Sequence, residues 1–202
     1  MVHNSFEDIF PDHAAARDAA IRWAREGLST DFVCLDTETT GLDYDDEAVS
    51  IGIVARDDRV LLNTLLCHEK PSNPLALAVH GVTWEMTRGV PRIAEVYETL
   101  VDLLTAAPVI GYNAGFDYLI IQQTLERYGL YSIYWSYSSD VMGKFAEFYG
   151  EWSDYHQSYT WKKLTFAAGF LGLSVAGAHG ADALMTLRVV EAMAGKKGRG
   201  EL

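Results

Sequence analysis

The sequence predicts an α/β fold in which helices flank one mixed β-sheet. Three apolar runs of strand length lie in the first half of the chain: FVCLD at 32–36, AVSIGIVARD at 48–57 and RVLLNTLLC at 59–67. A tight turn is expected at Asp57-Asp58, so these runs predict an antiparallel three-strand meander. The second half alternates helical patterns with the apolar run VIGY at 109–112, which is typical of parallel strands joined through helices.

An Ala-rich segment precedes the first predicted strand. Residues 12–27 read DHAAARDAAIRWAREG, with apolar residues at helical spacing and a final glycine, and this pattern predicts a helix. We expect residues 1–30 to form an N-terminal helical extension, residues 31–195 to form the main domain, and residues 196–202 to be a flexible tail.

The other helices are predicted from apolar stripes and from the residues at their ends. Ile93, Val96 and Leu100 lie on one stripe of a helix that begins at Pro91 and runs over 91–104. Ser or Thr introduces several of the later segments and Gly ends them, as helix caps commonly do. The remaining segments expected to be helical are 74–86 (as short pieces), 114–129, 136–150, 158–172 and 181–195.

The composition excludes some classes of protein. With a formal net charge of −12, the chain is not expected to hold nucleic acid through a broad basic surface, although an enzyme can reach phosphates through bound cations. Cys34 and Cys67 lie in apolar runs and are expected to be small buried residues in a reducing compartment. No secretory signal begins the chain, and no apolar stretch approaches the ~18 residues that span a bilayer. We therefore expect a cytoplasmic protein without a membrane segment.

Residues 36–47, DTETTGLDYDDE, are rich in carboxylates. They nearly match a calcium-binding loop, but such a loop lies between helices and has Asp or Asn where this sequence has Thr40. Asp36 and Glu38 instead end a predicted strand, so both point to the same face, with Cα atoms about 6.6 Å apart. Two carboxylates at this spacing can chelate a hard cation. The later acids, at 43–47, are expected to form a solvated loop.

Four motifs occur in order along the chain: DTETTGL at 36–42, HGVTWEM at 80–86, YNAGFD at 112–117, and His179 with Asp182. In this order they resemble the DnaQ-like 3′–5′ exonuclease superfamily, the DEDD group of the RNase H-like fold, and in particular its histidine-bearing branch. The resemblance runs from about residue 30 to residue 194 and implies an RNase H-like mixed sheet. One departure is that only Gly180 and Ala181 separate His179 from Asp182, which is shorter than the family's usual spacing.

The resemblance implies roles for individual residues. Asp36, Glu38, Asp117 and Asp182 match the family's four acids, which would together hold two divalent cations, Mg²⁺ or Mn²⁺. His179 matches the general base, which would take a proton from the attacking water. The products would be 5′-nucleoside monophosphates. The short loop leaves open whether His179 reaches the site.

Other motif residues are expected to contact the 3′ end of the substrate. Leu42 would be an apolar wedge beside the last base, and Phe116 would either stack on a base or pack in the core. His80 belongs to a motif that resembles a structural turn of the family, so it receives no catalytic role. The expected substrate-binding residues are Thr39, Thr40, Gly41, Leu42, Asn113 and Phe116.

Three hypotheses about function follow. The first is a metal-dependent 3′–5′ exonuclease that acts on single-stranded DNA, and the second is the same chemistry on RNA or short oligonucleotides. The third is a catalytically impaired nuclease-like domain that binds without cleaving. The expected partner is the 3′ end of a single-stranded nucleic acid, and DNA is favoured over RNA because the first hypothesis is preferred. The sequence makes no prediction about a protein partner or a homo-oligomer.

Aromatic residues are dense between residues 131 and 161, where nine Tyr and Trp and two Phe occur. They could form a stacking wall for single strands, a surface for a partner, or ordinary core packing. Of the three interpretations we favour packing in the core or at its half-buried edge.

Overall fold

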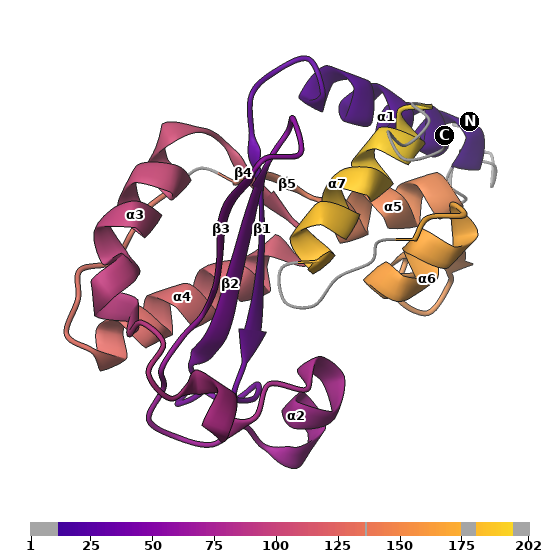
Figure 1. The fold of residues 1–202 in the computed structure, drawn as a ribbon. Helices are drawn as coiled ribbons and strands as arrows, with labels where there is room; N and C mark the ends of the chain where they lie inside the picture. Colours follow the sequence, from indigo (N-terminus) through magenta and orange to yellow (C-terminus); the bar gives the residue numbers. More distant parts are fainter. Residues whose placement is uncertain (1–11, 136, 175–180, 196–202) are drawn as a thin grey trace, which may run out of the picture.

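A computed structural model describes residues 12–135, 137–174 and 181–195 and shows one five-stranded mixed sheet between helices (Figure 1). The strand order is β3-β2-β1-β4-β5. Strand β1 pairs antiparallel with β2, which pairs antiparallel with β3, whereas β4 pairs parallel with both β1 and β5. The predicted meander with added parallel strands is confirmed. The strands are β1 Val33–Thr39, β2 Ala48–Ala55, β3 Val60–Leu65, β4 Val109–Gly111 and β5 Tyr137–Asp140.

The helices form a layer on each face of the sheet. Helices α3 and α4 cover one face, and α1, α5 and α7 cover the other, with α6 beside α7 (Figure 1). Helix α2 lies apart from both layers, near the carboxyl end of β1 (Figure 1). The bounds are α1 His13–Gly27, α2 Pro74–His80, α3 Ile93–Ala106, α4 Ala114–Arg127, α5 Val141–Tyr149, α6 Leu164–Phe170 and α7 Ala181–Met193, with a 3-10 helix at Trp84–Thr87.

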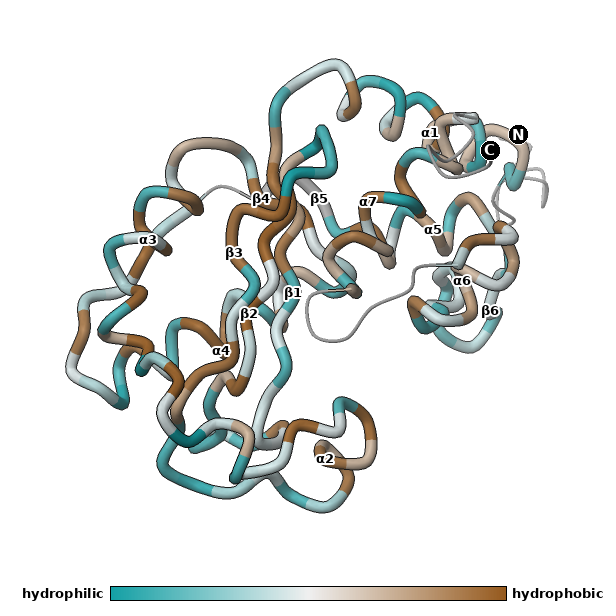
Figure 2. Tube along the Cα trace, viewed as in Figure 1, coloured by the Kyte–Doolittle hydropathy of each residue, from teal (hydrophilic) through white to brown (hydrophobic). Residues whose placement is uncertain are grey.

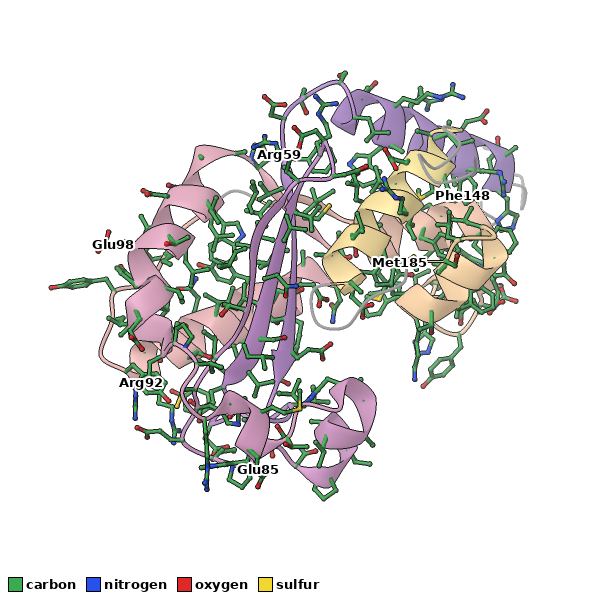
Figure 3. All side chains as sticks on the ribbon, in the orientation of Figure 1. Arg59, Glu85, Arg92, Glu98, Phe148 and Met185 are labelled. Carbon is green, nitrogen blue, oxygen red and sulfur yellow. The ribbon has the colours of Figure 1, made fainter. Side chains whose placement is uncertain are left out.

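The central strand β1 belongs to two hydrophobic cores. Cys34 faces the core under α1, α5 and α7, whereas Val33 and Leu35 face the core under α3 and α4. The apolar residues accordingly gather on the strands and on the inner sides of the helices (Figure 2). Phe148 lies inside the α1, α5 and α7 layer, whereas the exposed Glu98 points from α3 away from the sheet (Figure 3). A strand that is buried on both faces is held rigidly, so it can position functional residues at its end.

The predicted helix at 136–150 is wrong in its first part. Residues 137–140 form β5, and helix α5 begins only at Val141. The side chain of Asp140 accepts a hydrogen bond from the backbone N–H of Met142 at 2.8 Å, which is the geometry of a helix N-cap. Pairing with β4 holds the preceding residues extended, and the sequence pattern contains no sign of this long-range partner.

The predicted helix at 158–172 is also shorter than expected. Ser158–Tyr159 forms strand β7, which pairs with β6 at Trp152–Ser153 in a small hairpin. Only Leu164–Phe170 is helical. The helical pieces predicted within 74–86 are confirmed as α2 and the 3-10 helix.

Helix α1 packs into the core of the described chain. Ala20 and Ala24 are fully buried against α5 and α7, and small side chains at these positions permit close helix contact. Arg17 Nη1 donates a hydrogen bond to the carbonyl of Phe148 at 2.8 Å, and Arg25 Nε donates one to the carbonyl of Ala194 at 3.0 Å. The domain limits at residues 30 and 195 stay predictions. Over the residues that the structure covers, no helix has the length and apolar character to cross a membrane.

Candidate active site

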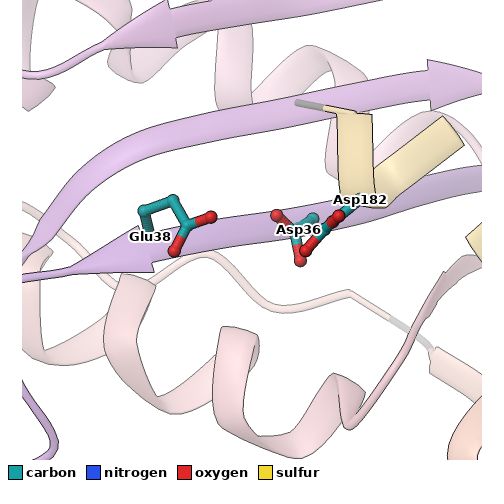
Figure 4. Close-up of side chains that lie close together, drawn as sticks. All are labelled: Asp36, Glu38 and Asp182. Carbon is teal, nitrogen blue, oxygen red and sulfur yellow. The ribbon is translucent and has the colours of Figure 1, made fainter. Parts of the chain in front are cut away.

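Three carboxylates meet at the carboxyl end of β1. Asp36 and Glu38 point to the same face of the strand, as their spacing predicts, and Asp182 reaches them from the first turn of α7 (Figure 4). One carboxylate oxygen from each side chain lies within 4.8 Å of the others. The pairing register between β1 and β2 shifts at Glu38 and Thr39, an irregularity of the kind that often occurs beside active sites.

The electrostatics of this cluster favour a bound cation. Burial, followed by the charges of Asp117, Asp182 and Glu38, raises the pKa of Asp36 well above its ordinary value. Burial and the charge of Asp182 raise the pKa of Glu38 to about 7, and burial raises the pKa of Asp182. Among the ion pairs of the described residues, none joins Lys or Arg to these three acids. Carboxylates gathered without a neighbouring cation have the donor chemistry that Mg²⁺ or Mn²⁺ requires.

Asp117 approaches Asp36 from another direction. It lies in the first turn of α4, is buried, and accepts a hydrogen bond from Thr37 Oγ1 at 2.7 Å. Burial raises the pKa of Asp117 to about 7, despite the opposing hydrogen bond from Thr37. Asp117 is outside the group of three carboxylates, but its charge contributes to the raised pKa of Asp36. Thr37 was missed as a site residue, although its position between the two motif acids was a usable signal.

Asn113 sets the start of helix α4. Its backbone has φ 71° and ψ 46°, in the left-handed region that Asn tolerates better than most residues. Its backbone N–H donates to Asp140 Oδ1 at 2.8 Å, the same oxygen that caps α5. Asp140 therefore joins α4 and α5 and fixes the turn that carries Asp117. The contact joins residues that are 27 positions apart, so no local sequence pattern indicates it.

A groove of about 370 Å³ opens beside the carboxylates. Glu38 belongs both to the carboxylate cluster and to the groove wall. Among the residues that line the groove, Leu42 follows β1 and is 83% exposed, whereas Phe116 lies on α4 and is half-buried. The groove is lined by Thr37, Glu38, Thr39, Gly41, Leu42, Asp43, Asn73, Leu75, Ala76, Val79, His80 and Phe116.

His80 has the structural role expected from its motif. Its Nδ1 accepts a hydrogen bond from the backbone N–H of Val82 at 2.9 Å, so in the neutral ring Nε2 carries the proton. Nε2 lies 3.1 Å from the carbonyl oxygen of Thr39 and donates to it. The histidine thus joins the end of α2 to the end of β1. Thr39 Oγ1 in turn donates to the carbonyl of Gly41 at 2.6 Å.

The expected solvated loop at 43–47 is wrong for its last two acids, and Thr40 differs from its expected role. Asp46 and Glu47 are buried because each carboxylate accepts hydrogen bonds within the fold. The Thr40 side chain is fully buried, and its hydroxyl donates to Asp46 Oδ1 at 2.6 Å. We therefore assign Thr40 to the architecture of the loop, where its hydroxyl is not available to a substrate.

Two other predictions have different outcomes. His179 lies outside the described residues, so its role stays a prediction. In the aromatic region, core packing is confirmed for Phe145 and Phe148, whereas Tyr155 and Trp161 are 90% and 69% exposed.

The family match and the shared fold identify this protein, with its mixed sheet and carboxylate cluster, as an exonuclease enzyme with an RNase H-like fold. The chain belongs to the exonuclease family named for RNase T, whose model matches residues 33–190. It is 36% identical over 179 residues to a protein of Escherichia phage 186 named Uncharacterized exonuclease CP81, and the match covers 85% of this chain and 92% of that protein. It is 35% identical over 95 residues to the DNA polymerase III subunit epsilon of Pasteurella multocida (strain Pm70), covering 42% of this chain and 38% of that subunit.

Solved structures of exonuclease I share the fold. A structure of exonuclease I with bound product superposes with a TM-score of 0.68 at 16% sequence identity and covers 83% of this chain and 44% of that one. A structure of E. coli exonuclease I with a dT13 oligonucleotide gives a TM-score of 0.65, also at 16% identity, over 80% and 40% of the two chains. The chain thus spans less than half of exonuclease I and of the polymerase subunit.

We expect divalent cations to stabilise the protein most at neutral and alkaline pH. The pKa of Glu38 is about 7 in the folded chain, above its ordinary 4.5, so deprotonation opposes folding. The loss of folding stability is absent below pH 4.5, the ordinary pKa. It grows as the pH rises towards about 7, the pKa in the folded chain, and it is complete above that pH. A bound dication replaces the proton and removes this loss. The rise in Tm caused by Mg²⁺ over EDTA should be larger at about pH 8 than at about pH 5, and an equal rise would contradict the prediction.

Proposed function

We propose that the protein is a metal-dependent 3′–5′ exonuclease that releases 5′-nucleoside monophosphates from single-stranded DNA. The proposal depends mainly on the position of Glu38, which belongs both to the carboxylate cluster and to the wall of the groove. A strand end held in this groove would present its last phosphodiester to the acids. The groove volume of 370 Å³ falls within the range of roughly 300–1,000 Å³ that small-molecule sites occupy.

The groove walls suit a nucleobase better than a phosphate. Leu42, Leu75 and Val79 are each more than four-fifths exposed and present apolar surface to it. Stacking and apolar contact tolerate any base, because every base has an apolar face. The lining residues include Glu38 and Asp43 but no Lys or Arg. The negative phosphate therefore needs cations held by the carboxylates, in agreement with the net charge of −12.

Each acid has a defined part in the proposed reaction. Asp36, Glu38, Asp117 and Asp182 would hold two Mg²⁺ or Mn²⁺ ions. When bound, such ions neutralise the scissile phosphate and lower the pKa of an attacking water. Asp117 is buried and fixed by α4, Asp36 is half-buried and fixed by the strand, and Asp182 is exposed at the start of α7. His179 is proposed to accept the proton of the water.

DNA is the substrate we propose, and RNA is the second candidate. The relatives named DNA polymerase III subunit epsilon and the exonuclease I structures with deoxyoligonucleotides support DNA. A 2′-hydroxyl would distinguish RNA from DNA at this site. Action in the cytoplasm remains part of the proposal.

The proposal is tested with matched DNA and RNA single strands labelled at either end. With Mg²⁺ or Mn²⁺, we expect a 5′-labelled DNA strand to shorten progressively and a 3′-labelled one to release labelled mononucleotide at once. EDTA should stop both reactions. Faster loss of RNA would favour the second candidate. Binding without any cation-dependent cleavage would favour an impaired nuclease-like domain, and shortening from the 5′ end would refute the proposed polarity.

A further inference from the structure

One buried carboxylate outside the metal site organises the loop that forms a wall of the groove. The side chain of Asp46 is only 2% exposed. Its Oδ1 accepts a hydrogen bond from Thr40 Oγ1 at 2.6 Å, and its Oδ2 accepts one from the backbone N–H of Asp43 at 2.7 Å. The loop between β1 and β2 therefore wraps around a single carboxylate. The side chain of Leu42, in the same loop, is exposed to solvent.

The same carboxylate lies against the start of helix α2, the other wall of the groove. A Cβ atom on Gly41 would overlap Oδ2 of Asp46 and Nδ2 of Asn73, so only glycine fits between them. Asn73 caps α2 through its side chain, and its backbone N–H donates to the carbonyl of Thr40 at 2.7 Å. The position of Asp46 thus governs the loop with Leu42 and the helix that carries Leu75 and Val79.

Lys70 neutralises this buried carboxylate. Its Nζ lies 2.8 Å from Asp46 Oδ1 and 3.0 Å from Asp45 Oδ2. The backbone N–H groups of Glu69 and Lys70 donate to Oε1 of Glu47 at 2.8 and 3.1 Å, which fixes the segment that carries the lysine. A buried carboxylate is costly unless a cation and hydrogen bonds compensate it, and Asp46 has both.

We infer that Asp46, paired with Lys70, is a positioning residue that sets the shape of the groove for the terminal nucleotide. The inference rests on the proposed function of that groove. Within the described chain, Asp46 makes no hydrogen bond or ion pair with Asp36, Glu38 or Asp182. Its loss should therefore weaken the binding of a strand end while chemistry at a bound phosphate continues.

The test compares Asp46→Asn with Asp45→Asn. Both acids pair with Lys70, but Asp45 is 66% exposed and accepts no hydrogen bond from the loop, so it is a matched control. On a single-stranded oligodeoxythymidylate, Asp46→Asn should raise KM about tenfold with kcat changed less than about twofold, since uniform binding is lost. Asp45→Asn should leave both constants unchanged. Hydrolysis of bis(4-nitrophenyl) phosphate, a diester without a base, should be the same in all three proteins.

A second variant keeps the inference testable if Asp46→Asn does not fold. Lys70→Met retains both loop hydrogen bonds to Asp46 and removes only the cation, and it should also raise KM. The double variant should be no worse than Asp46→Asn alone, because the two residues act as one unit. An unchanged KM in a folded Asp46→Asn protein would overturn the inference. So would an equal loss of rate on both substrates, which would indicate a defect at the metal site.

Failure of the proposed function can be distinguished from failure of the inference about Asp46. If the proposed function is wrong, the wild-type protein would not shorten the oligonucleotide from its 3′ end. Fluorescence anisotropy of the same labelled oligonucleotide with Ca²⁺ would then still compare the variants by binding alone. Weaker binding by Asp46→Asn than by Asp45→Asn supports the inference, and equal binding refutes it.

Discussion

Replacement of Asp36 by Asn is expected to abolish nuclease activity while it stabilises the metal-free protein. Asp36 is a half-buried member of the carboxylate cluster, and desolvation with the charges of Asp117, Asp182 and Glu38 raises its pKa. An amide removes one charge from this repulsion, so the folded metal-free chain gains stability at pH values where the acid would be ionised. The same change removes a cation ligand. Since metal ions supply several kcal/mol of transition-state stabilisation, a loss of about 10³-fold or more in kcat is expected.

The two opposite effects are measured on one pair of variants. Shortening of labelled single strands with Mg²⁺ gives the activity, and thermal unfolding in EDTA near about pH 8 gives the stability. Asp154→Asn, the same substitution at an exposed acid of the small hairpin, is the control and should change neither. The rise in Tm caused by Mg²⁺ should disappear in Asp36→Asn. An active Asp36→Asn protein, or one that unfolds at a lower Tm in EDTA, would show that Asp36 is an ordinary structural acid.

The part of the site that could be predicted from sequence is the part that depends on strand geometry and motif order. Asp36 and Glu38 are two residues apart on one strand, so both must point to the same face, and the structure confirms that their carboxylates lie together. Asp182 comes from a helix far along the chain, so its approach to β1 could be expected only through the resemblance to a family. The fold was predictable for a similar reason, because each of the first three strands is a clear apolar run.

The parts that could not be predicted depend on partners distant in sequence. β5 is extended because it pairs with β4, whereas its own residues lead directly into a helix. Asp46 and Glu47 lie in a run of acids that locally indicates a solvated loop. They are buried because Lys70 and Tyr128, which lie 24 and 81 positions further along the chain, bring a cation and hydrogen-bond donors to them. Local patterns report propensity, but burial of a charge depends on the whole fold.

Glu47 provides the second large effect, a loss of stability. Its side chain is fully buried, and Oε1 accepts hydrogen bonds from the backbone N–H groups of Glu69 and Lys70. Oε2 accepts one from Tyr128 Oη at 2.7 Å, and Arg127 Nε lies 3.8 Å away. Glu47→Ala removes the acceptor of all three bonds and leaves the arginine without its buried partner. We expect the free energy of unfolding to fall by about 3 kcal/mol.

Graded variants separate the carboxylate from the bonds it accepts. Tyr128→Phe removes one donor and leaves the two backbone bonds of Glu47, so a loss of about 1 kcal/mol is expected. Glu47→Gln keeps an acceptor for Glu69 and Lys70 but loses the charge, and its unfolding free energy should lie between those of the other two variants. Chemical denaturation of each protein at one pH in EDTA gives these values. If Glu47→Ala unfolded within about 0.5 kcal/mol of the wild type, Glu47 would behave as the solvated surface acid that its local sequence suggests.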